Sequence, residues 1–159
     1  MASGDERAEV LDLDGSSLHI GLISARWNTD VVERLADGAR RGLASLGVTN
    51  ISEATVPGAF ELPFAAQTLA QSGRVDGVVV VGAVIRGETT HYELVAGECG
   101  RGIMNVQLET RVPIGMGVLT VENTDQANAR SEKSGGHNVG EEAALVAVEL
   151  ALQAKAWPA

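Results

Sequence analysis

The segment from Gly87 to His91 places a glycine, a carboxylate, two hydroxyls and a histidine shortly after a strongly apolar run. That run, Val78 to Val81, consists of consecutive β-branched residues, which cannot alternate between a buried and an exposed face of a sheet. Such a run is typical of a central strand in a parallel sheet. Ligands of open α/β sheets bind beyond the carboxyl ends of the strands, and backbone N–H groups at a helix start attract anions. The sequence therefore predicts an anion-binding turn between a buried strand and a helix.

The chemistry expected of this turn is phosphate binding beside a proton carrier. Gly87, Glu88 and Thr89 supply backbone N–H groups, and Thr89 and Thr90 add hydroxyl donors. His91 suits proton transfer next to a bound anion, because the unperturbed pKa of histidine lies near neutrality. A Gly–Thr–Thr–His turn is not specific to this use. From the residues alone, a polar helix cap with an incidental histidine is an equal alternative.

Three further side chains follow other expected strands or helix ends, and each has two readings. Trp27 offers a platform on which a planar ring stacks, or it is a partly buried packing residue. Glu61, in the first turn of a helix, accepts hydrogen bonds from ligand hydroxyls or simply caps the helix dipole. Arg130, at the end of a short helix, pairs with phosphate or lies in solvent. We expect these residues near the Gly87–His91 turn, because the carboxyl ends of parallel strands share one sheet edge.

Alternating strand and helix patterns position these side chains. Strands are expected over residues 18–25, 51–56, 77–85 and 112–120, and helices over about 29–46, 57–72, 91–109, 124–130 and 140–156. Pro63 fits only the first turn of the second helix. The alternation predicts a flavodoxin-like three-layer α/β/α fold with a four-stranded parallel sheet. A G-x-G-x-x-G fingerprint is absent after the first strand, which disfavours a dinucleotide-binding domain.

The third expected helix contains three interior glycines: Gly97, Gly100 and Gly102. Each costs roughly 1 kcal/mol of helix stability relative to alanine, so a close approach of another helix is the expected reason for them. We also expect this face of the helix, which lacks side chains, to let helices of symmetry-related subunits pack closely.

Residues 1–16 form an N-terminal arm that precedes a single domain over residues 17–159. Leu11 and Leu13 alternate with aspartates, which is a strand pattern without an obvious partner in its own sheet. The arm is therefore either a disordered tail or a strand that adds to the sheet edge of a neighbouring subunit.

Composition disfavours several classes of function. The net charge of −9 and the pI of about 4.7 argue against nucleic acid or a basic membrane-surface patch as partners. No apolar stretch reaches the length of a membrane span, and residues 1–9 lack the apolar core of a signal peptide, so a cytoplasmic protein is expected. Cys99 is the only cysteine and the histidines are scattered, so neither an intrachain disulfide nor a zinc site is expected.

Several motifs, in the right order along the chain, resemble the 6,7-dimethyl-8-ribityllumazine synthase family. The most specific is GAVIRGETTHYE at residues 82–93. Trp27, PGAFELP at residues 57–63, GVLT at 117–120 and GEEAA at 140–144 match more weakly. The resemblance covers nearly all of the chain from Leu18 onward.

The resemblance implies a transferase of riboflavin biosynthesis that needs neither a metal nor a bound cofactor. Its reaction joins 5-amino-6-(D-ribitylamino)uracil to 3,4-dihydroxy-2-butanone 4-phosphate and gives 6,7-dimethyl-8-ribityllumazine, phosphate and water. The amine would attack the ketone to form an imine, phosphate would leave, and the ribitylamino nitrogen would close the ring, with His91 moving the protons. The alternative is a non-catalytic flavin- or lumazine-binding protein on the same scaffold, which would bind ligands without turnover.

The resemblance also implies roles for individual residues. The pyrimidine would stack on Trp27 and the ribityl hydroxyls would meet Glu61, while Arg130 would help to hold phosphate. The full set of expected substrate-binding residues is Trp27, Ala59, Phe60, Glu61, Val84, Ile85, Gly87, Glu88, Thr89, Met116 and Arg130. The pocket would lie between subunits of a homopentamer, or of a multiple of pentamers, so Met116 and Arg130 would come from a neighbour.

One position departs from the family pattern. Many members carry a lysine just before the glycine that matches Gly140, whereas this chain has Val139. Lys133, His137 and Asn138 of the preceding loop are candidates to replace that lysine.

Overall fold

A computed structural model of the chain describes residue 7 and residues 9–159. Parallel strands form one four-stranded sheet in the order β2-β1-β3-β4. The strands are β1 (His19–Ala25), β2 (Asn50–Val56), β3 (Gly77–Ile85) and β4 (Ile114–Val121). The helices are α1 (Thr29–Ser45), α2 (Leu62–Gln71), α3 (His91–Thr110), α4 (Thr124–Ala129) and α5 (Val139–Ala156), with a 3₁₀ turn over Ala59–Glu61 before α2.

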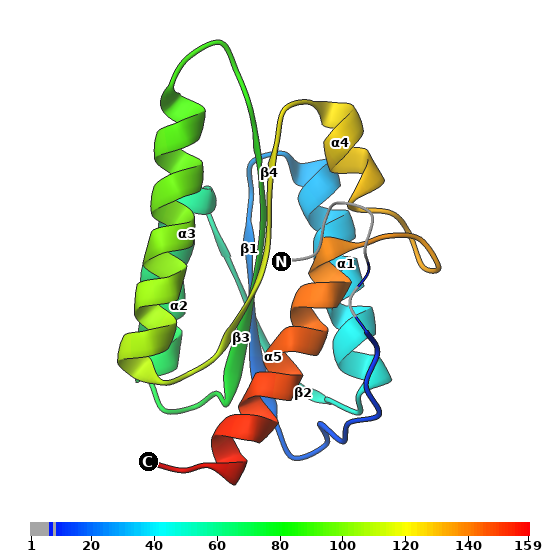
Figure 1. Cartoon of the computed structure of the whole chain (residues 1–159), viewed down its shortest axis with the longest axis vertical. Helices are drawn as coiled ribbons and strands as arrows, with labels where there is room; N and C mark the ends of the chain where they lie inside the picture. Colours follow the sequence, from blue (N-terminus) through cyan, green and yellow to red (C-terminus); the bar gives the residue numbers. More distant parts are fainter. Residues whose placement is uncertain (1–6, 8) are drawn as a thin grey trace.

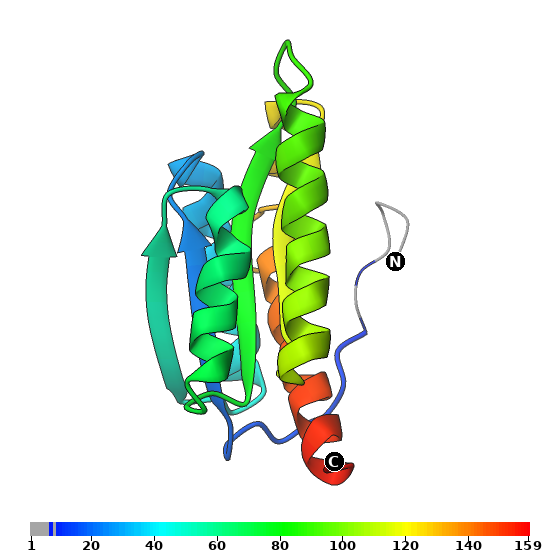
Figure 2. The same cartoon turned by 90° about the vertical axis from the view of Figure 1, so that its left-hand side faces the viewer.

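The sheet lies between two helical layers, as Figure 1 shows. Helices α1 and α5 cover one face of the sheet, and α2 and α3 lie side by side on the other (Figure 2). Strand β3 pairs in parallel with β1 on one side and β4 on the other, and it is fully buried from Gly77 to Ala83. The predicted flavodoxin-like three-layer fold and its buried central strand are therefore confirmed.

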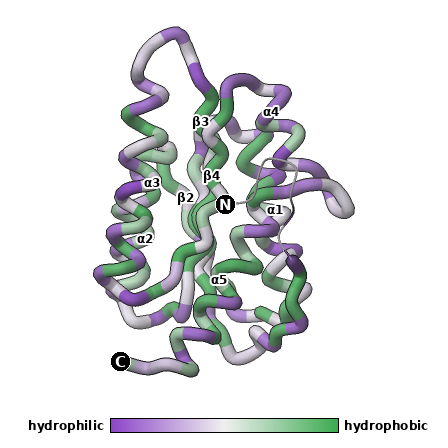
Figure 3. The backbone as a smooth tube through the Cα atoms, viewed as in Figure 1, coloured by the Kyte–Doolittle hydropathy of each residue, from purple (hydrophilic) through white to green (hydrophobic). Residues whose placement is uncertain are grey.

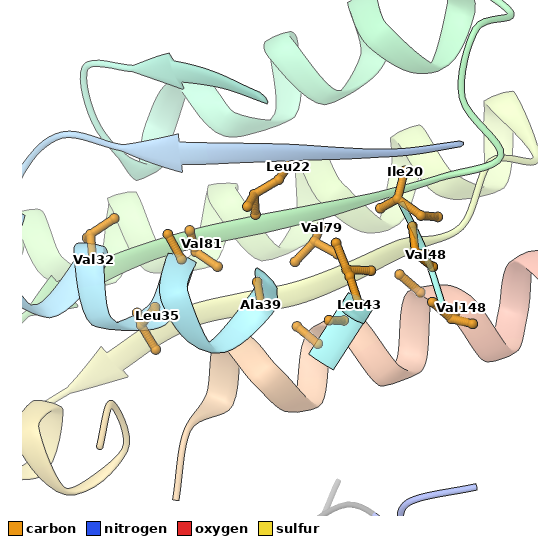
Figure 4. Packing of buried hydrophobic residues seen from close by; sticks show 14 of the residues in the cluster. Ile20, Leu22, Val32, Leu35, Ala39, Leu43, Val48, Val79, Val81 and Val148 are labelled. Atoms are coloured by element: carbon orange, nitrogen blue, oxygen red, sulfur yellow. The ribbon is translucent and has the colours of Figure 1, made fainter. Parts of the chain in front are cut away.

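The four consecutive valines of β3 serve two separate cores. Val79 and Val81 face α1 and α5, whereas Val78 and Val80 face α2 and α3. Figure 4 shows Leu43 of α1 packed among the residues of the first core. Each buried valine stabilises the fold by roughly 1.5–3 kcal/mol relative to an exposed one. The apolar residues gather along the sheet and the inner sides of the helices (Figure 3).

Small residues let α5 pack directly on the backbone of its neighbours. A Cβ atom added to Gly115 of β4 would lie 2.0 Å from the carbonyl oxygen of Ala143 in α5. A Cβ atom added to Gly140 would lie 2.0 Å from the carbonyl oxygen of Leu35 in α1. Neither position accepts any side chain without movement of a helix, so both glycines are required for the close packing of α5 on β4 and α1.

The glycines of α3 have different surroundings. A Cβ atom on Gly102 would lie 2.7 Å from Pro63 of α2, so the expected close approach of a helix is found there. Among the described residues, an added Cβ on Gly97 would meet nothing within 4 Å, and one on Gly100 would meet only Met116, at 3.8 Å. The described part of the chain therefore explains Gly102 but leaves a bare surface at Gly97.

The described part of the N-terminal arm, residue 7 and residues 9–16, forms no strand within this chain. Leu13 packs against the α1–α5 core, and the Gly15 N–H donates to the Leu46 carbonyl oxygen at 2.7 Å. Residues 1–6 and 8 of the predicted arm lie outside the described residues. Within the described residues, no helix is long and apolar enough to cross a membrane.

Candidate active site

A pocket of about 420 Å³ lies at the carboxyl edge of the sheet, where the ends of β1 and β3 adjoin. The chain leaves β1 toward the α1 face and leaves β3 toward the α3 face, so this is the switch point at which α/β sheets bind ligands. The residues that line the pocket are Trp27, Asn28, Pro57, Gly58, Ala59, Phe60, Glu61, Ala83, Val84, Ile85, His91, Leu94 and Val95. Most of the residues expected for pyrimidine binding are thus brought together with His91.

Two aromatic side chains stand at this pocket without being buried. Trp27 is 72% exposed and Phe60 is 53% exposed. Large aromatic side chains usually pack inside a protein, so two exposed ones at one pocket indicate a surface that binds a planar apolar group. The alternative reading of Trp27 as a partly buried packing residue does not fit this exposure.

Asn28 fixes the segment that carries Trp27. Its backbone is left-handed, with φ 62° and ψ 49°, which asparagine tolerates better than most residues. Its side-chain Nδ2 donates to the carbonyl oxygen of Ala83 at 2.9 Å, so it joins the end of β1 to the end of β3. The Trp27 N–H donates to the Pro57 carbonyl oxygen at 3.3 Å. Although Asn28 precedes the first residue of α1, its side chain makes no capping hydrogen bond to that helix.

The next wall of the pocket is the tight turn before α2. The Glu61 N–H donates to the Gly58 carbonyl oxygen at 3.2 Å and closes the 3₁₀ turn. Ala59 is buried, and fully buried Leu62 anchors the turn in the α2–α3 core. Pro63 lies in the first helical turn, as predicted. The turn therefore offers its backbone and the Glu61 carboxylate to the pocket.

The end of β3 forms the floor. Val84 and Ile85 are half-buried and pair with Thr120 and Val121 of β4. Their side chains lie on opposite sides of the sheet, with Val84 against the α2–α3 core and Ile85 against the α1–α5 core. The peptide groups at this strand end therefore border the pocket while the side chains anchor it.

Residues 87–90, which we call the phosphate turn, connect β3 to α3. All four are exposed, and His91 follows as the first residue of α3. The His91 N–H donates to Thr89 Oγ1 at 3.4 Å. His91 lines the pocket, whereas Gly87, Glu88 and Thr89 lie next to it in the chain without lining it. The pocket thus joins a planar-ring surface to a histidine that is preceded by an exposed, hydroxyl-bearing turn.

Two of the expected residues lie elsewhere in this chain. Met116 is paired with Val80 in the middle of β4, and its Sδ-bearing side chain reaches toward Gly100 of α3. Arg130 follows α4, and its Nη1 donates to the Gln126 carbonyl oxygen at 3.1 Å. Neither residue lines the pocket of its own chain.

The loop after Arg130 is fastened to α1. Arg34 Nε donates to the Ser131 carbonyl oxygen at 3.0 Å. Asn138 is 2% exposed, and its Nδ2 donates to the carbonyl oxygens of Arg34 and Glu132, each at 2.9 Å. Asn138 is therefore committed to the fold, which removes it from the candidates for the missing lysine. Lys133 is exposed at a turn that the Gly136 N–H closes at 2.9 Å.

A larger depression of about 510 Å³ lies beside the pocket, between α1 and α4. It contains Asp30 and Arg34 but no aromatic side chain, and Arg34 is already bonded to Asn128 at 2.6 Å. Within the described residues, no group of three or more histidine, cysteine or acidic side chains could hold a metal ion. The pocket with Trp27 and His91 is therefore the better candidate for chemistry.

These features define an α/β protein of the flavodoxin-like type whose ligand site lies at the carboxyl edge of a parallel sheet. A model of the 6,7-dimethyl-8-ribityllumazine synthase family matches residues 17–155. The chain therefore belongs to the 6,7-dimethyl-8-ribityllumazine synthase family.

Individual relatives carry the same name. The chain is 45% identical over 150 residues to 6,7-dimethyl-8-ribityllumazine synthase of Paracidovorax citrulli, covering 93% of this chain and 94% of that protein. It is 46% identical over 148 residues to the synthase of Kineococcus radiotolerans, covering 92% and 91%. It is 46% identical over 154 residues to that of Azoarcus sp., covering 95% and 96%. The predicted family resemblance is confirmed.

Proposed function

We propose that this chain condenses 5-amino-6-(D-ribitylamino)uracil with 3,4-dihydroxy-2-butanone 4-phosphate to give 6,7-dimethyl-8-ribityllumazine, phosphate and water. The observation that carries the proposal is the convergence of Trp27, the Ala59–Glu61 turn, the end of β3 and His91 on one pocket. Family membership supports the same reaction.

The aminouracil fits the aromatic and backbone part of the pocket. Its planar ring stacks on exposed Trp27, and its polar edges meet the peptide groups of Ala59, Phe60, Val84 and Ile85. Its ribityl hydroxyls donate to the Glu61 carboxylate. These contacts hold the ring amine near His91, and no side chain forms a covalent bond with the substrate.

The phosphorylated ketone fits the other end. The phosphate turn supplies N–H groups at the start of α3, where the helix dipole favours an anion. The Glu88 side chain points away from the phosphate, since two anions in contact would repel. The amine attacks the ketone to form an imine with loss of water, and elimination of phosphate followed by tautomerisation of the enol generates a second carbonyl. The ribitylamino nitrogen attacks that carbonyl and closes the ring with loss of a second water. Each step moves a proton, and His91 carries it between the reacting groups.

Incubating the purified protein with both substrates and following lumazine formation by its absorbance and fluorescence tests this proposal. We expect turnover that requires both substrates and releases phosphate in step with lumazine. Tight binding of lumazine or of the aminouracil without product formation would instead identify a non-catalytic binding protein.

The active form is a homopentamer or a multiple of pentamers, with the pocket completed by Met116 and Arg130 of an adjacent subunit. Three features support this assembly: neither residue lines the pocket of its own chain, the surface at Gly97 is bare, and apolar side chains of α2 and α3 are exposed. Those side chains are Phe64, Met104 and Leu108. Repeated contacts between unlike surfaces close into such rings.

Light scattering at several protein concentrations tests the assembly. A fully active monomer of 16.5 kDa would refute both the oligomer and the shared site. The proposal includes a cytoplasmic location and strand addition by the arm; cell fractionation tests the first, and deletion of residues 1–14 tests the second.

A further inference from the structure

We propose that Arg86 is a positioning residue, which holds the phosphate turn and His91 against the pocket and does not itself bind phosphate. The inference rests on the proposed function, because the turn matters for turnover only if it receives the phosphorylated substrate. Arg86 lies next to the phosphate turn, and simple charge complementarity would assign it to phosphate binding.

The Arg86 side chain joins two elements at the carboxyl edge of the sheet. Its Nε donates to Oε2 of Glu122, just beyond β4, at 2.7 Å, and its Nη1 donates to Oε1 of Glu93 in the first turn of α3. The guanidinium carbon lies 4.2 Å from the centroid of the Tyr92 ring, within the range of a cation–π contact. The Arg86 N–H donates to the Val121 carbonyl oxygen at 2.9 Å. Arg86 thus ties the end of β4 to the start of α3.

The phosphate turn has weak bonds of its own. The His91 N–H reaches Thr89 Oγ1 at 3.4 Å, and the Leu94 N–H reaches the Thr90 carbonyl oxygen at 3.4 Å, which is at the outer limit for hydrogen bonds. Tyr92 and Glu93, which Arg86 holds, follow His91 immediately in α3. Fixing these two residues therefore fixes the backbone from which His91 reaches the pocket.

Charge makes Arg86 a poor phosphate ligand in this arrangement. Its single positive charge is shared by two carboxylates, those of Glu93 and Glu122. The hydrogen bond from Arg86 holds the pKa of Glu93 below its ordinary value, so Glu93 is ionised at neutral pH. A phosphate dianion that approached this group would meet a net negative charge, whereas the backbone N–H groups of the turn carry no such opposition.

Removing one of the carboxylates separates the two roles. Glu122→Gln weakens the tether but leaves Arg86 in place. If Arg86 positions the turn, kcat falls about threefold to fivefold, as loss of a surface ion pair allows, and KM for the phosphorylated ketone does not fall. If Arg86 binds phosphate, its release from Glu122 lowers that KM instead and leaves kcat unchanged.

Substitution of Arg86 itself gives the second readout. Arg86→Met should lower kcat about tenfold and leave KM for the aminouracil unchanged. Arg86→Lys keeps the charge but cannot bridge both carboxylates in the same plane, so it should recover little of the lost kcat. The double variant with Glu122→Gln should be no slower than Arg86→Met alone, because both changes break one tether.

Arg40→Met is the matched control. Arg40 also bridges two carboxylates, with Asp37 and Glu53 each at 2.7 Å, but it joins α1 to β2 away from the pocket. We expect wild-type kcat for this variant. Full rescue by Arg86→Lys, or a lower KM for the ketone in Glu122→Gln, would overturn the inference. Wild-type kcat in both Glu122→Gln and Arg86→Met would also overturn it. An inactive wild-type protein would refute the proposed function, and the inference with it.

Discussion

Three substitutions of Asn28 should separate its left-handed backbone from the hydrogen bond of its side chain. Glycine adopts the observed φ of 62° freely but cannot donate to the Ala83 carbonyl oxygen. Alanine can neither donate nor adopt this conformation without strain. Aspartate tolerates the conformation, but its carboxylate would face the carbonyl oxygen and repel it.

The structure sets the order and size of the effects. Loss of the donated hydrogen bond costs about 1 kcal/mol, and up to about 3 kcal/mol if the Ala83 oxygen remains unpaired. Left-handed strain adds about 1–2 kcal/mol in alanine. We therefore expect Asn28→Gly to lose about 1–3 kcal/mol of unfolding free energy and Asn28→Ala about 2–5 kcal/mol. Asn28→Asp should fall between them or match alanine.

Urea unfolding followed by far-ultraviolet circular dichroism measures these losses, at one fixed protein concentration because the proposed self-association would shift the midpoint. KM for the aminouracil should rise in all three variants, since Asn28 fixes the segment that carries Trp27. Equal losses for glycine and alanine would show that the backbone is not strained. Wild-type stability and a wild-type KM for the aminouracil in Asn28→Gly would refute the role of the Asn28 side chain in joining β1 to β3.

Four other predictions concern the proposed catalytic histidine, the proposed phosphate arginine, a tightly packed glycine and the buried cysteine. His91→Ala should lower kcat about a hundredfold or more with the fold retained, since the residue is exposed at a helix start; unchanged turnover would remove it from the mechanism. Arg130→Ala should raise KM for the phosphorylated ketone more than KM for the aminouracil, whereas equal rises would indicate a structural role. Gly115→Ala should lose about 1–3 kcal/mol in urea unfolding, because its Cβ would meet the Ala143 carbonyl oxygen at 2.0 Å, and an unchanged midpoint would contradict this contact. Burial raises the pKa of the Cys99 thiol to about 11, so it should resist alkylation at pH 8 in the native protein and react after unfolding. The stability that this shift contributes is fully present below the ordinary pKa of 9.0 and is lost as the pH rises through about 11.

The fold could be predicted well because its strongest signals are local. The valine run of β3 requires two buried faces, and Pro63 fits only the start of a helix, so both were placed correctly from the sequence. The start of β4 was predicted two residues early, at Val112 rather than Ile114. Pro113 lies between them and has no N–H to give to a sheet, which is the physical reason for the later start.

The site was predictable only in part because its supports are distant in sequence. Nothing local marks Asn28 as the partner of Ala83, or Arg86 as the partner of Glu122, since these contacts depend on which strand ends adjoin in the sheet. The roles of Met116 and Arg130 depend on a second chain, so they remain predictions. Pocket residues such as Leu94 gave no signal beyond an ordinary helical pattern.

The exposure of Trp27 gives the protein an optical probe at its own pocket. The chain has two tryptophans, and the other, Trp157, follows the end of α5. Replacing Trp157 by phenylalanine would leave an indole whose emission comes only from the pocket wall. Because a stacked ring quenches indole emission, stopped-flow mixing of that variant would resolve the arrival of the pyrimidine from the later appearance of the fluorescent product.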